Sequence, residues 1–77
     1  MQSIYSAEYK AFLARLRQLR LAKRLTQVQV ARALRKPQSF VSKIERGERR
    51  LDPLELKAVA RLYGVTVDRL LNSPRSH

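Results

Sequence analysis

Two helix-start patterns stand close together in residues 26–46, TQVQVARALRKPQSFVSKIER. Thr26 and Gln29 form a T-x-x-Q capping box, in which two side chains satisfy the free backbone N–H groups of a helix start. Pro37 cannot continue that helix but suits the start of another. Gly47 then supplies a C-terminal stop. The stretch predicts two short helices joined by a tight turn, over about 26–34 and 38–46.

The residues facing inward on these two helices fit a steep crossing. Ala31 is small enough for two helices to approach closely, as a crossing near 90–120° requires. Val41 and Ile44 follow it by ten and thirteen residues, and we expect them to pack against Val30 and Leu34. This spacing is typical of a helix-turn-helix unit.

Three further helices are predicted around this unit. The first starts at Ser6 and runs to about Lys23, with apolar residues three and four apart. Lys10, Arg15 and Arg17 lie off its apolar stripe and are expected in solvent. The other two follow the caps Asp52 and Thr66, and no strand pattern is present. We therefore expect a single all-α domain of five helices over 1–77, with an ordered core over about 7–71 and a tail over 72–77.

Charge indicates the kind of partner. The chain holds 17 Lys and Arg against 6 Asp and Glu, a formal net charge of +11. Residues 10–50 contain thirteen of the bases and two acids, whereas residues 51–77 contain four bases and three acids. A basic first part favours a polyanion such as nucleic acid; a solubilising surface and membrane-surface binding are the alternatives.

Other residue types narrow the class of protein. There is no cysteine and one histidine, so we expect no metal site, no cofactor and no enzyme activity. No apolar run reaches the length of about 18 residues that spans a membrane. No secretory signal pattern is found at the N-terminus, and a cytoplasmic protein is expected.

The segment LTQVQVARALRKPQSFVSKIERGERRLDPLELKAVARLYGVTVDRLL resembles the Xre type of helix-turn-helix domain, which phage repressors, Cro proteins and restriction–modification controllers share. The resemblance extends from Leu16 to about Leu71 and rests on the motifs LTQ, SKIERG and YGVTVDRLL. It implies the five-helix lambda-repressor-like fold, with the second helix of the unit in the DNA major groove.

The resemblance also implies roles for individual residues. Gln38 lies where the family reads bases, and its amide suits adenine; the other candidate readers are Ser39, Ser42 and Lys43. Gln27 matches a glutamine that contacts the DNA backbone, and three arginines beyond the reading helix are further candidates for phosphate contacts: Arg46, Arg49 and Arg50. The alternative for each of these residues is an ordinary solvated position. Phe40 could touch a thymine methyl or lie across the surface of the helix, and the sequence does not decide between these two positions.

Two more sets of residues have implied roles. Arg20 and Glu45 match a family pair in which an inward arginine bridges to the reading helix, a structural salt bridge. The last helix is the expected dimer surface, through Val67, Leu70 and Leu71, although these residues suit a core equally well.

Three positions depart from the family pattern. Arg35 stands where the turn usually has glycine, so a positive φ there would be strained. Pro37 replaces a common serine or threonine cap. Val28 is apolar at a position that is usually polar and exposed.

The leading hypothesis is a sequence-specific transcriptional regulator, a repressor or controller that binds double-stranded DNA as a homodimer on a palindromic operator. One alternative is an antitoxin that represses its own operon and also binds a toxin. Another is a basic RNA-binding or adaptor protein that uses the same fold. Whether a protein partner exists stays open.

Overall fold

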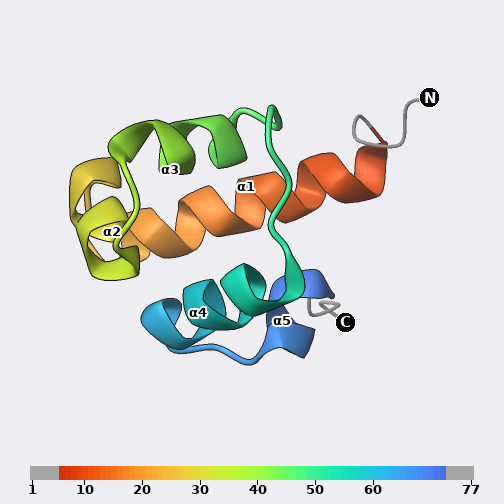
Figure 1. Ribbon diagram of the computed structural model, residues 1–77. Helices are drawn as coiled ribbons and strands as arrows, with labels where there is room; N and C mark the ends of the chain where they lie inside the picture. The colour runs from red at the N-terminus through yellow and green to blue at the C-terminus, as the bar shows by residue number, and fades with distance from the viewer. Residues whose placement is uncertain (1–5, 73–77) are drawn as a thin grey trace.

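A computed structural model describes residues 6–72, and within this range all regular structure is helical. The predicted five-helix architecture is confirmed (Figure 1). Figure 1 shows α1 between α3 on one side and the α4–α5 pair on the other. The expected tail beyond Asn72 lies outside the described residues. The helices are α1 Ala7–Ala22, α2 Gln27–Leu34, α3 Gln38–Glu45, α4 Pro53–Tyr63 and α5 Val67–Leu71.

The predicted caps set the starts of these helices. The Thr26 hydroxyl accepts from the backbone N–H of Gln29, and the Gln29 side chain accepts from that of Thr26. Asp52 and Glu55 form the same capping box at α4. Pro37 occupies the cap position of α3 and makes no side-chain cap hydrogen bond. α3 therefore depends on its packing and its preceding turn rather than on a cap.

The turn between α2 and α3 ends α2 in the left-handed conformation. Arg35 has φ 59° and ψ 45°, its N–H donates to Arg32 O, and the N–H of Lys36 donates to Ala31 O at 2.9 Å. These two bonds form a Schellman motif. The left-handed position of this motif, here Arg35, is usually glycine, because a side chain makes that backbone conformation strained. Gly64 ends α4 with the same bonding pattern at φ 71°. The turn is thus regular, and Arg35 bears the predicted strain.

The core forms where the four longer helices meet α5. Ala31 is 3% exposed and Val41 and Ile44 are each 4% exposed, so the steep crossing of α2 and α3 is buried as the spacing predicted. Phe40 is also buried, at 7% exposure, and therefore belongs to the core rather than to a surface that could touch a thymine methyl. The complete buried apolar set is Phe12, Leu16, Val30, Ala31, Phe40, Val41, Ile44, Val59, Ala60, Tyr63 and Leu70.

Two expectations about the ends of the chain are corrected by packing. Leu70 is 0% exposed, so it fills the core and cannot itself contact a second subunit. Arg15 is half-buried rather than solvated, because its guanidinium donates to Leu70 O and Leu71 O, both at 2.9 Å. These bonds satisfy carbonyls at the C-terminus of α5, where free carbonyls otherwise need water. Arg15 thereby ties α5 to α1.

Candidate nucleic-acid interface

The outer face of α3 carries the predicted reading residues together. Gln38, Ser39 and Lys43 are exposed, and Ser42 is half-buried. They lie opposite Val41 and Ile44, the residues that pack α3 onto the core. The outer face thus offers an amide, two hydroxyls and an ammonium group, which match the donors and acceptors of base edges in the major groove.

Beneath this face, Arg20 of α1 and Glu45 of α3 form the expected ion pair. The Arg20 Nε and Nη2 atoms donate to the two carboxylate oxygens of Glu45 at 2.7 and 3.1 Å, and Nη1 donates to Leu25 O at 3.0 Å. Both side chains are 9% exposed. The hydrogen bond to Glu45 raises the pKa of Arg20. Glu45 is the one acid in α3, and it faces inward.

Gln27 connects this ion pair to the reading face. Its Nε2 donates to Glu45 Oε1 at 3.0 Å, and its Oε1 lies 3.5 Å from Nε2 of Gln38. Gln27 is half-buried at the N-terminus of α2. Free N–H groups at a helix start favour an anionic oxygen, so this location suits the predicted backbone contact. The series of side-chain hydrogen bonds from Arg20 through Glu45 and Gln27 to Gln38 could not be predicted from residue spacing alone.

At the other end of α3, two of the three predicted phosphate-contacting arginines pair with acids of the chain itself. Arg46 binds Glu48 through Nε and Nη2 at 2.9 and 3.2 Å, with side chains 58% and 52% exposed. Arg46 thereby lowers the pKa of Glu48. Arg49 binds both carboxylate oxygens of Glu55, at 2.8 and 3.1 Å. The Arg46–Glu48 pair is exposed and therefore weak, so Arg46 can exchange its partner, whereas Glu55 is only 12% exposed.

Glu55 is the centre of a cluster that sequence reasoning missed. Besides Arg49 and its capping role, it accepts from Lys36 Nζ at 3.5 Å. The hydrogen bond from Arg49 is the main cause that lowers the pKa of Glu55 to about 2. The guanidinium of Arg49 and the ammonium of Lys36 lie 4.6 and 5.2 Å from the centre of the Phe40 ring. The D-P-L-E motif revealed the cap but not these tertiary contacts.

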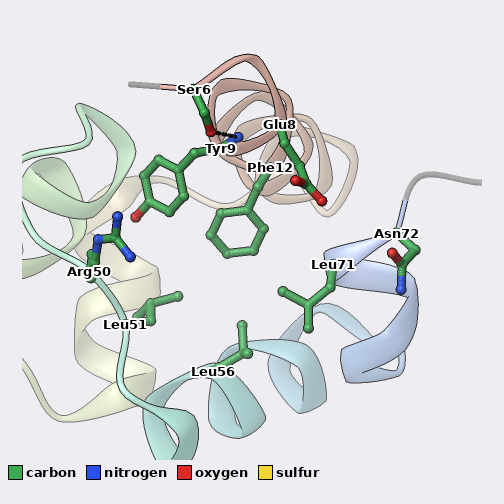
Figure 2. Close-up of a pocket in the computed structure, with 9 residues that line it drawn as sticks. All are labelled: Ser6, Glu8, Tyr9, Phe12, Arg50, Leu51, Leu56, Leu71 and Asn72. Atoms are coloured by element: carbon green, nitrogen blue, oxygen red, sulfur yellow. Dashed lines mark hydrogen bonds between the residues drawn. The ribbon is translucent and has the colours of Figure 1, made fainter. Parts of the chain in front are cut away.

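Arg50, the third predicted clamp, is directed to another part of the surface. Its guanidinium lies 5.1 Å from the centre of the Tyr9 ring of α1. Both residues line a groove of about 520 Å³ between the start of α1, the loop before α4 and the end of α5. Figure 2 shows Phe12, Leu51, Leu56 and Leu71 around the open space. Arg50 is therefore a groove residue, and the case for a phosphate contact rests on Arg46 and Arg49.

The charged and polar groups around α3 form an exposed surface that suits binding of a nucleic acid. Across residues 6–72, no group of three or more His, Asp and Glu side chains could hold a metal ion. Among the same residues, no helix is both long and apolar enough to cross a membrane. A helix-turn-helix with polar and basic side chains on the outward face of α3 and arginines beyond it has the form of a DNA-binding domain.

Comparison with known families gives the same answer. The model of a helix-turn-helix family matches residues 16–70. The chain belongs to this family, the Xre and Cro-like helix-turn-helix proteins, as the motifs predicted. Its class is that of DNA-binding transcription regulators, whose partner is double-stranded DNA. No curated protein and no solved structure matched the chain.

Proposed function

We propose that this protein is a sequence-specific repressor or controller that acts in the cytoplasm by binding alone, without enzyme activity. The observation that carries the proposal is the outer face of α3. Glu45, the one acid of α3, points inward and pairs with Arg20. The reading side chains can therefore approach DNA without a carboxylate on the outer face that would repel phosphates. Gln38, Ser39, Ser42 and Lys43 are the proposed readers, and Gln27, Arg46 and Arg49 the proposed backbone contacts.

The proposal includes a homodimer on a palindromic operator, with half-sites about one helical turn, ~34 Å, apart. Leu71 supports it, because this α5 residue is 44% exposed and borders the groove of Figure 2. Val67 of the same helix is half-buried. Two highly basic copies repel one another least where their charges balance, and residues 51–77 are nearly neutral. Leu71→Asp should weaken self-association in sedimentation; unchanged association would exclude Leu71 from the interface.

A salt titration tests the DNA-binding proposal. Fluorescence anisotropy would compare a pool of random duplexes, a duplex enriched from that pool by the protein, and single-stranded RNA. A specific regulator should hold the enriched duplex at ~200 mM salt while losing the random one, because phosphate contacts alone weaken steeply with salt. Equal loss of both duplexes, or tighter binding to RNA, would contradict the proposal.

A further inference from the structure

The amide of Gln27 has its orientation set by Glu45. A carboxylate only accepts hydrogen bonds, so the amide nitrogen of Gln27 must face it, as it does at 3.0 Å. Glu45 in turn is held by two hydrogen bonds from Arg20 and is largely buried. Turning the Gln27 amide over would place two oxygen atoms against each other. The Oε1 atom of Gln27 is therefore directed away from Glu45, toward α3.

The same reasoning extends one residue further, to Gln38. Its Nε2 lies 3.5 Å from Gln27 Oε1, which can only accept. One N–H of Gln38 is thus directed at Gln27. Its second N–H and its oxygen remain available on the exposed reading face. One donor and one acceptor are what the major-groove edge of adenine requires, whereas guanine presents two acceptors there.

We propose that Glu45 is a positioning residue for base recognition: acting through Gln27, it fixes the polarity of the Gln38 amide and so favours adenine over guanine. The inference rests on the proposed function, since it concerns the base that Gln38 reads. Glu45 touches no base itself. We call the two hydrogen bonds that join Glu45 through Gln27 to Gln38 the relay. Without the relay, the Gln38 amide could turn over and offer both N–H groups to the two acceptors of guanine.

Glu45→Gln is the direct test, because glutamine keeps the shape and can still accept from Arg20 while presenting either end of its amide to Gln27. The base pair read by Gln38 is first located with Gln38→Ala. At that pair, the ratio of affinities for adenine and guanine duplexes should fall about five-fold or more, the lower end of discrimination by a bidentate contact. Affinity for random duplex should stay within about two-fold, because phosphate contacts are kept.

Gln27→Met provides a second variant if Glu45→Gln does not fold, since Gln27 is only half-buried. It removes both bonds of the relay, and the adenine-to-guanine ratio should fall in the same way even where overall affinity also drops. Arg32→Gln is the matched control: it lowers the charge of α2 at an exposed position without touching the relay, and the ratio at the Gln38 base pair should not change. An unchanged ratio in both relay variants overturns the inference.

A measurement on the free protein separates this inference from the proposed function. In nuclear magnetic resonance spectra, the Gln27 side-chain proton bound to the carboxylate should lie downfield and should move upfield in Glu45→Gln. Identical Gln27 signals in the two proteins overturn the relay even if the wild type selects a sequence. A wild type that selects no sequence contradicts the proposed function, and the spectra then still decide whether the relay exists.

Discussion

The two ends of α3 are built from different chemistry. At its N-terminal end, the neutral amide of Gln38 is joined through Gln27 to the Arg20–Glu45 ion pair, whose acid is the last residue of α3 and whose side chains are 9% exposed. Beyond its C-terminal end, Arg46 pairs with an acid on the open surface, where both side chains are more than half exposed. Arg49 is held more firmly, by an acid that is 12% exposed. The amide of Gln38 is thus held by the fold, whereas Arg46 has a partner that it can exchange.

This difference suggests a division of labour in DNA binding. Base discrimination needs donors and acceptors in a fixed arrangement, which the buried ion pair supplies through Gln27. Phosphate binding needs positive charge more than orientation, and an exposed pair is weak enough to give way to a phosphate. Specificity is therefore expected to depend on the N-terminal end of α3 and salt-sensitive affinity on the residues after it.

The largest expected effect comes from breaking the ion pair. Arg20→Met should lower the free energy of unfolding by about 3–5 kcal/mol, because it leaves the charge of Glu45 buried and unpaired. Urea unfolding would measure it. In the double variant Arg20→Met with Glu45→Met no charge is left unpaired, so most of the lost stability should return. A single variant that loses less than about 1 kcal/mol would show that the buried ion pair beneath α3 contributes no more than a surface pair.

A smaller effect is expected from Glu55 of α4, which pairs with Arg49 beyond the C-terminal end of α3. Folding lowers its pKa from 4.5 to about 2, so its carboxylate stabilises the fold fully above about pH 4.5 and no longer does so below about pH 2. Since Arg49 and Lys36 are about 40% exposed, solvent screening reduces the gain to about 1–2 kcal/mol. Glu55→Gln should lose this amount at pH 7 and nothing near pH 2. Equal losses at both pH values would contradict the assignment.

The turn between the helices should give the smallest change, and in the opposite direction. Arg35→Gly relieves a left-handed residue and should raise the free energy of unfolding by about 0.5–1 kcal/mol, after allowing for the greater freedom of glycine when unfolded. Arg32→Gly is the matched control, because Arg32 is exposed inside α2, the helix that Arg35 ends. This change should lower the free energy of unfolding by about 1 kcal/mol. Thermal unfolding would compare them. If both variants lowered the free energy of unfolding, the turn at Arg35 would not be strained.

Local patterns were sufficient to predict much of this fold. Caps such as Thr26 and Asp52 gave the helix starts, and the spacing of Ala31 with Val41 gave the crossing. The roles of Leu70, Arg15 and Phe40 depended on which residues from distant parts of the chain came together. An apolar residue on a short helix suits a core and a dimer surface equally, and only packing decided that Leu70 is buried. The pairing of Arg49 with Glu55 also depends on packing. The two residues are six positions apart across a turn, so helical spacing does not predict their contact.

The central claim is that the N-terminal end of α3 specifies sequence while the residues after it supply affinity. Selection of binding sites from a random duplex library, with the wild type, Gln38→Ala and Arg46→Ala in parallel, tests it most directly. Gln38→Ala should relax the preference at one or two base pairs, each worth about 1–3 kcal/mol, whereas Arg46→Ala should select the same sites with a salt slope reduced by about 1. Unchanged preferences in Gln38→Ala, or preferences altered by Arg46→Ala, would contradict this account.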